Sequence, residues 1–382
     1  MNIGLLMPKM MYAVVGYEIN IYFKNIVTVI NPNNYSFEVE SQFGRTDADR
    51  WHWIPAAENV GEHVLRLSVW NDDGKVAESE SLLSVVPADA GEGRELTLLE
   101  IGASCMVGEG HGNALWQRFQ SAGNPKLTML GSHAPGYKEV QPGGPANEAY
   151  GGWNWRTFFD KTKSYNLDND GLHPKRPHDV PSPFLFNENG SFVFDFAKYL
   201  DKYCGGKKPD AVMFELGVNG LFIAKTDEEA RWYLDNNIVP YMKRMLAEIR
   251  RVVPHVKFGM ELIPPGSSSQ DAFGANYGTQ QSRRRWLLNA YILHKCYMDL
   301  AAELDYDLVP AFINYDCDRN YPRKTAPHSK AARLWSREPP TPFTPHLKAT
   351  ASGLTRSSSG LNTLCGKCIL AAASRPLKEL SV

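Results

Sequence analysis

The sequence has few cysteines, no long apolar run and no excess of charge of either sign. The four cysteines that precede residue 330, of six in the chain, show no pairing pattern, so a disulfide framework is not expected. No stretch approaches the roughly 20 apolar residues that a membrane-spanning helix needs. The 41 basic and 42 acidic residues nearly balance, so charge gives no reason to expect binding to nucleic acid or to an anionic membrane.

The chain of 382 residues is long enough for two domains and a large hydrophobic core. Its first nine residues lack the basic start and the long apolar stretch of a secretory signal. We therefore expect a cytoplasmic protein, unless the true start lies upstream of Met1.

The first quarter of the chain has the pattern of an all-β domain. Polar and apolar residues alternate in residues 18–23, 35–40 and 63–70, as they do in half-buried strands. The sequence Asn-Asp-Asp-Gly at residues 71–74 supplies the turn of a hairpin. Several short strands separated by turn residues predict an immunoglobulin-like β-sandwich over residues 1–90.

Two tryptophans, Trp51 and Trp53, stand within this β segment. We expect them to pack inside the sandwich or at its seam, because large apolar side chains are mostly buried. An exposed aromatic platform that binds sugars is the alternative. Residues 87–93 are small, polar and without pattern, which predicts a linker to the next domain.

From residue 94 onward, apolar runs of strand length alternate with helical segments, which favours a parallel sheet covered by helices on both faces. The first run, residues 96–101, stops at Gly102, and Ser104 follows at the turn before a helical stretch. A strand, a tight turn and a helix present a reactive side chain at the carboxyl edge of a sheet. Ser104 is therefore a candidate nucleophile, and a helix-capping serine is the alternative.

Two later segments carry further blocks. Gly151 lies in a Gly-Gly-Trp-Asn-Trp loop before a helical segment, and residues 209–216 form a second buried-strand run that ends just before Asn219. Ser104, Gly151 and Asn219, in this order, resemble the first three blocks of the SGNH (GDSL-type) hydrolases, in a branch with an N-terminal β domain. The resemblance implies a flavodoxin-like three-layer α/β/α hydrolase domain over residues 94–326.

The resemblance also implies a reaction. The family hydrolyses acyl esters through an acyl-serine intermediate, here acyl-Ser104, and needs neither a metal nor an organic cofactor. A backbone N–H near Gly151 and the side-chain amide of Asn219 would stabilise the oxyanion. The expected substrate is a small-molecule or carbohydrate-linked ester, with an acetyl ester as the first expectation. The alternatives are a catalytically impaired carbohydrate-binding protein and a lipid or thioester hydrolase on the same fold.

The chain departs from the family pattern at each block. Ala103 stands where an aspartate usually precedes the serine, Ala149 where a glycine is expected, and Gly220 where an aspartate often follows the asparagine. Alanine keeps both backbone groups, so the first two changes leave the serine and a backbone N–H in place. The third change is expected to loosen the support of the Asn219 loop.

In this family the base that takes the serine proton is a histidine in a late DxxHP segment. His173 has this literal spelling, but it precedes the third block and lies in a loop-rich stretch. His346 follows the last expected strand, but no aspartate stands three residues before it. We expect neither histidine to serve as the base, because each lacks the context of the motif.

Beyond residue 326 the character of the sequence changes. Residues 334–382 are rich in Pro, Ser, Thr and Ala and lack periodicity, which predicts disorder. When residues 338–351 are back-translated and shifted by one nucleotide, the degenerate codons permit a sequence that resembles the family's last block, histidine included. We therefore interpret residues 327–382 as a frameshifted tail and expect the chain as printed to lack its catalytic base.

Overall fold

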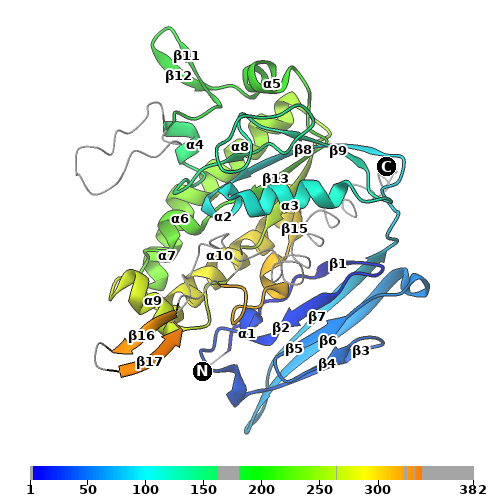
Figure 1. Ribbon diagram of the computed structural model, residues 1–382, viewed down its shortest axis with the longest axis vertical. Helices are drawn as coiled ribbons and strands as arrows, with labels where there is room; N and C mark the ends of the chain where they lie inside the picture. Colours follow the sequence, from blue (N-terminus) through cyan, green and yellow to red (C-terminus); the bar gives the residue numbers. More distant parts are fainter. Residues whose placement is uncertain (1–2, 162–179, 264, 322–324, 330–331, 338–382) are drawn as a thin grey trace.

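The N-terminal part of the protein consists of two β-sheets (Figure 1). One has the strand order β1-β7-β6-β3 and the other the order β2-β5-β4. The computed structural model describes residues 3–161, 180–263, 265–321, 325–329 and 332–337. The N-terminal strands are β1 (Met10–Val14), β2 (Ile19–Tyr22), β3 (Ser36–Ser41), β4 (Arg45–Thr46), β5 (Arg50–Trp53), β6 (Gly61–Asn71) and β7 (Gly74–Val86).

The hairpin expected in this part is confirmed. Asn71 at the end of β6 pairs with Gly74 at the start of β7. Gly74 has a φ of +133°, a conformation that L side chains rarely adopt. The buried position expected for the two tryptophans is also confirmed, because Trp51 is 1% and Trp53 9% exposed. The alternative of an exposed aromatic platform at these residues is therefore wrong.

A parallel sheet forms the second part of the protein, as the alternation of strands and helices predicts. Its order is β10-β8-β13-β14-β15, and β9 pairs with the first half of β8. Every pairing in this sheet is parallel. The strands are β8 (Glu95–Gly102), β9 (Lys126–Leu130), β10 (Glu148–Ala149), β13 (Ala211–Glu215), β14 (Lys257–Glu261) and β15 (Asp307–Val309).

Helices connect these strands, and side-chain caps begin several of them. Thr226 accepts a hydrogen bond from the Glu229 N–H, and Ser282 caps the longest helix of the described residues. A π-helical turn, η4 (Leu234–Ile238), joins α7 to α8. The helices are α1 (Phe23–Ile26), α2 (Ser104–Val107), α3 (Glu109–Phe119), α4 (Thr157–Asp160), α5 (Phe196–Cys204), α6 (Val218–Leu221), α7 (Asp227–Tyr233), α8 (Val239–Val252), α9 (Gln270–Tyr277) and α10 (Arg283–Leu304).

Two pairs of short strands form separate two-stranded sheets. β11 (Leu185–Glu188) and β12 (Ser191–Phe194) pair as a hairpin, and so do β16 (Thr325–Ser329) and β17 (Ala332–Arg337). Within the described residues, the 3₁₀ turns η1 (Pro32–Asn34) and η2 (Ala57–Asn59) belong to the N-terminal part, and η5 (Ala311–Asn314) follows β15. The proposed domain boundary at residue 326 falls inside β16, and the tail from residue 338 lies outside the described residues.

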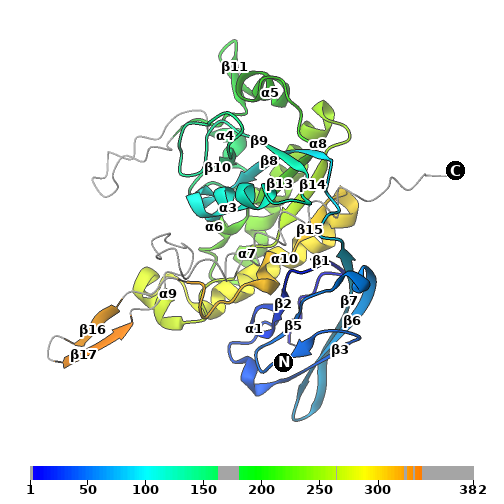
Figure 2. The ribbon, with the colours of Figure 1, turned by 45° about the vertical axis from the view of Figure 1, so that its right-hand side comes forward.

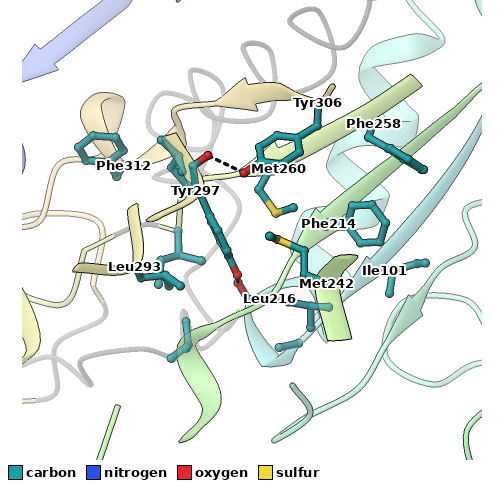
Figure 3. Close-up of a cluster of buried hydrophobic side chains, with 14 of the residues drawn as sticks. Ile101, Phe214, Leu216, Met242, Phe258, Met260, Leu293, Tyr297, Tyr306 and Phe312 are labelled. Carbon is teal, nitrogen blue, oxygen red and sulfur yellow. Dashed lines mark hydrogen bonds between the residues drawn. The ribbon is translucent and has the colours of Figure 1, made fainter. Parts of the chain in front are cut away.

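Alternate side chains of the parallel sheet enter two separate apolar clusters. Leu98 and Met213 pack with Leu115 and Phe119 of α3. The neighbouring strand residues point the other way, because side chains alternate along a strand. On that second face the cluster includes residues of the strands and of α8, α10 and nearby segments (Figure 3): Ile101, Phe214, Leu216, Met242, Phe258, Met260, Leu293, Tyr297, Tyr306 and Phe312. Both faces of the sheet are therefore covered.

Buried hydrogen bonds join the N-terminal sheets to the parallel-sheet part. The side-chain amide of Asn25 donates to the carbonyls of Phe312 and Tyr315 at 2.8 and 2.6 Å. The Asn20 N–H donates to the Asn314 side chain at 2.7 Å. Figures 1 and 2 both show the N-terminal sheets on the side of α10, at the end of the protein opposite α5. Within the described ranges, no helix is long and apolar enough to cross a membrane.

Replacing Asn25 should destabilise the whole protein. Asn25→Ala removes the shorter of the two hydrogen bonds that each carbonyl accepts. Only the long contacts of the Tyr315 N–H at 3.5 Å and the Cys317 thiol at 3.7 Å remain, and an under-satisfied buried group costs about 1–3 kcal/mol. We expect the free energy of unfolding to fall by about 2–4 kcal/mol, measured by urea denaturation. Asn236→Ala is the control, because its amide makes an exposed bond within its own helical segment. Equal stability of the two variants would show that the Asn25 hydrogen bonds between the N-terminal sheets and the parallel-sheet part add nothing to the free energy of unfolding.

Candidate active site

Ser104 occupies the first position of α2, directly after β8 and the extended residue Ala103. The N-cap is Ala103, and no side chain caps this helix, so the interpretation of Ser104 as a capping residue is wrong. Gly102 is required at the turn, because a Cβ added there would lie 2.6 Å from the Met106 sulfur. The half-buried Ser104 is thereby presented at the carboxyl edge of the sheet.

The turn that contains Gly151 lies beside the end of β8. Strand β10 pairs with β8 so that Ala149 is opposite Gly102, and the Tyr150 N–H donates to the Gly102 carbonyl at 3.0 Å. Gly151 is the next residue. Its N–H group, a candidate oxyanion donor, donates at 2.8 Å to the hydroxyl of Tyr137. The structure therefore brings the Gly151 turn to the strand end that carries Ser104.

Asn219 follows the strand on the other side of β8. Glu215, the last residue of β13, is opposite Gly102. The side-chain amide of Asn219 donates one hydrogen bond to the Trp153 carbonyl, at 2.7 Å. This contact joins the Asn219 loop to the Gly151 turn across 66 residues of sequence. An amide carries two N–H hydrogens, so the second remains for a ligand.

Gly220, at the position where the resemblance led us to expect an aspartate, has a structural reason. A Cβ at Gly220 would lie 1.7 Å from the Tyr233 hydroxyl oxygen, and Gly220 has a φ of +89°. That hydroxyl donates to the Asn219 carbonyl at 3.1 Å and accepts from the Asn154 amide at 2.7 Å. Tyr233 thus gives the Asn219 loop the support that an aspartate was expected to provide.

A buried carboxylate supports the Gly151 turn. Glu148, fully buried, accepts hydrogen bonds from the Tyr150 hydroxyl at 2.6 Å and the Tyr199 hydroxyl at 2.8 Å. It also accepts from the N–H and the hydroxyl of Ser132, at 2.5 and 2.9 Å. Burial raises the pKa of Glu148, while the hydroxyl donors act against that shift. Sequence reasoning missed this network, because it joins residues up to 51 positions apart.

Three more glutamates are buried on the α3 side of the parallel sheet, near the Ser104 turn. Glu100, Glu215 and Glu261 lie on adjacent strands and are 0, 1 and 5% exposed. His111 of α3 contacts the Glu100 carboxylate at 2.9 Å. A sequence signal was present, because each glutamate interrupts an apolar strand run close to its carboxyl end. In the portion of the chain that is described, no group of His, Cys, Asp and Glu residues could hold a metal ion.

Burial and mutual charge shift the pKa values of this acidic cluster. Burial, aided by the charge of Glu261, raises the pKa of Glu215 to about 8. Burial likewise raises the pKa of Glu261 to about 7. For His111, burial acts to lower the pKa, but the charge and hydrogen bond of Glu100 dominate and raise it to about 9. Cys105, beside Ser104 and Glu215, has its pKa raised well above the usual value by burial, so it is a weak nucleophile.

The described histidines supply no evident partner for Ser104. His294 is buried on α10 with its ring 4.7 Å from that of Phe312, and burial lowers its pKa to about 3. His173 and His346 lie outside the described residues. The identity of the base therefore stays a prediction.

Stability should fall as the pH rises from about 5 to 9. In the unfolded chain the two glutamates Glu215 and Glu261 lose their protons near pH 4.5 and His111 loses its proton near pH 6.5. In the folded chain the raised pKa values of Glu215, Glu261 and His111 keep these protons bound to higher pH. The unfolded state then binds fewer protons, so the free energy of unfolding decreases with pH. Each pKa unit corresponds to about 1.4 kcal/mol.

Thermal melts at unit steps of pH should reveal this decline. Glu215→Gln should flatten it between pH 5 and 8, whereas Glu62→Gln, on the exposed face of β6, should keep the profile of the unmodified chain. A decline that is identical in all three proteins would contradict the role of Glu215.

No protein-family model and no curated protein match the chain. Among solved structures, it is similar to a "possible lipase" from Chitinophaga pinensis, at 14% identity over 72% of this chain and 98% of that chain, with a TM-score of 0.36. It is also similar to a family 3 carbohydrate esterase from Clostridium thermocellum, at 14% identity over 55% of this chain and 99% of that chain, with a TM-score of 0.27.

A third similarity is shorter. A variant of an endo-fucoidan hydrolase of glycoside hydrolase family 107 matches at 14% identity over 22% of this chain, with a TM-score of 0.18. The chain spans 14% of the length of that protein. At these identities and TM-scores the similarities assign no family to the chain, so its function has to be argued from the residues at the carboxyl edge of the parallel sheet.

Proposed function

We propose that the chain is a serine hydrolase of acyl esters with an SGNH-type three-layer domain, in which Ser104 is the nucleophile. One observation carries the proposal. The adjacent strands β10, β8 and β13 end in register, and the Gly151 turn, Ser104 and Asn219 follow these three ends. A proposed nucleophile and proposed oxyanion donors therefore follow neighbouring strand ends at one edge of the sheet, which supports the proposal.

In the proposed reaction the Ser104 hydroxyl oxygen attacks the ester carbonyl carbon and loses its proton to a base. The carbonyl oxygen becomes an oxyanion, which a backbone N–H of the 149–152 turn and the free N–H hydrogen of the Asn219 side chain stabilise. The alcohol leaves with a proton, and water hydrolyses acyl-Ser104 to release the acid. Losing one oxyanion donor typically costs about 3 kcal/mol of barrier.

For the substrate we propose a small-molecule or carbohydrate-linked ester, with an acetyl ester first. A lipid or thioester substrate is the alternative on the same scaffold, because acyl specificity lies in loops. The alternative of a catalytically impaired carbohydrate-binding protein loses the sugar-binding platform at Trp51 and Trp53, since both are buried. Its remaining sequence arguments are the departures from the family pattern and the expected lack of a base.

Replacing Ser104 should abolish catalysis in a version of the chain whose reading frame is corrected before codon 338. Ser104→Ala removes the nucleophile, and p-nitrophenyl acetate hydrolysis should fall at least ~10³-fold. A fluorophosphonate probe should label the corrected chain at Ser104 and leave the variant unlabelled. Ser121→Ala, at an exposed serine after α3, is the control. Full activity in Ser104→Ala would refute the proposed nucleophile.

The chain as printed should be nearly inactive, because we propose that its tail lacks the base. The oxyanion donors remain, so a residual advantage of ~10³–10⁴-fold over water is expected. The measurement compares ester hydrolysis by the printed chain and by the frame-corrected chain at equal concentration. Equal rates would show that a base is already present, and His173→Ala and His346→Ala would then identify it.

A further inference from the structure

Tyr137 lies in a turn that is fastened to the helices after Ser104. The Gly136 N–H donates to the Val107 carbonyl, at the end of α2, at 2.8 Å. Ala134 and Lys138 close the turn by exchanging backbone hydrogen bonds of 2.8 and 3.2 Å. The Lys138 ammonium group also contacts the Glu109 carboxylate of α3 at 2.9 Å. The position of Tyr137 is therefore set by the same segment that presents the nucleophile.

The hydroxyl of Tyr137 connects this turn to the Gly151 turn, because it accepts the hydrogen bond of the Gly151 N–H at 2.8 Å. The preceding N–H groups have other acceptors. Ala149 donates to the Asn147 side chain at 3.3 Å, and Tyr150 donates to the Gly102 carbonyl at 3.0 Å. The acceptor of the Gly151 N–H is thus a side chain. A ligand can displace a side-chain acceptor more readily than it can displace a backbone carbonyl of a strand.

The backbone of Tyr137 has an unusual conformation. Among the described residues, only Tyr137, Asn189 and Asp305 combine a side chain with a positive φ, and the φ of Tyr137 is 59°. Asn and Asp tolerate this region, whereas a bulky residue there is an outlier. Such conformations persist where the surrounding structure enforces them, and they cluster at functional sites. The contacts of Gly136 and Lys138 supply that enforcement here.

We infer that Tyr137 gates the oxyanion site: its hydroxyl oxygen occupies the place of the substrate's carbonyl oxygen and has to leave before the ester is activated. This inference rests on the proposed function, because it takes Gly151 as an oxyanion donor. A phenol oxygen and an ester carbonyl oxygen are both neutral acceptors of one N–H, so the two compete for the Gly151 group. Displacement of the Tyr137 side chain, with the turn itself held in place, releases the donor, and the ester oxygen then replaces the Tyr137 hydroxyl.

Tyr137→Phe tests the gate directly. Phenylalanine keeps the ring, which lies 5.1 Å from that of His133 and 6.4 Å from that of Tyr150, but removes the competing acceptor. The second-order rate of fluorophosphonate labelling at Ser104, measured on the frame-corrected chain, should rise about 2- to 10-fold, the equivalent of one net hydrogen bond. Tyr203→Phe, at an exposed ring on α5, should label at the original rate.

A labelling rate that falls or stays unchanged in Tyr137→Phe would refute the proposal that Tyr137 blocks the oxyanion site. Slower labelling of Tyr137→Phe means that the hydroxyl assists the reaction, and an unchanged rate means that releasing Gly151 brings no gain. No labelling of either frame-corrected protein rejects the proposed function. Tyr137→Leu repeats the comparison if the phenylalanine variant does not fold. Peptide mass spectrometry of the labelled residue separates the two hypotheses. Labelling at Ser104 with no gain rejects the gate alone, whereas labelling only at another residue rejects the proposed function.

Discussion

The pairing of Gly102 with strands on both sides is the constraint on which the candidate site depends. Its neighbours across the sheet are Ala149 of β10 and Glu215 of β13, so the turns that follow these strands start level with the Ser104 turn. A slip of one residue would reverse the faces of a whole strand and move Glu215 into the apolar cluster on the opposite side. The register of the strands therefore positions the site and also maintains the core.

Sequence patterns predicted the strands that carry the site, because buried parallel strands are short apolar runs with clear ends. They also placed Ser104 and Asn219 after strand ends and Gly151 in a loop before a helical segment, whereas the short strand β10 that precedes Gly151 was not predicted. The structure brings the three residues to neighbouring strand ends. The roles of these residues are still proposals. The contacts that support them could not be predicted, since Tyr137, Tyr233 and Glu148 act through partners 14 to 79 positions away. Only the fold determines which of these residues meet.

The buried glutamates show a different limit of sequence reasoning. A carboxylate inside an apolar run contradicts the local pattern, and burying its charge without partners is costly. Glu100, Glu215 and Glu261 nevertheless lie on neighbouring strands beneath the Ser104 turn, where His111 offsets part of their charge. Natural proteins break local rules mainly at functional or strained sites. The position of these residues in the strands was visible in the sequence, but their mutual contact was not.

The hydrogen bonds between the N-terminal sheets and the segment after β15 have a consequence for the order of folding. Asn25 reaches its two carbonyl partners across 287 and 290 residues. During synthesis, the N-terminal sheets leave the ribosome long before those carbonyls exist, and contacts of such long range slow folding because a large loop has to close first. The part of the protein that is made first is therefore completed last, and until then its buried asparagines depend on water for their hydrogen bonds.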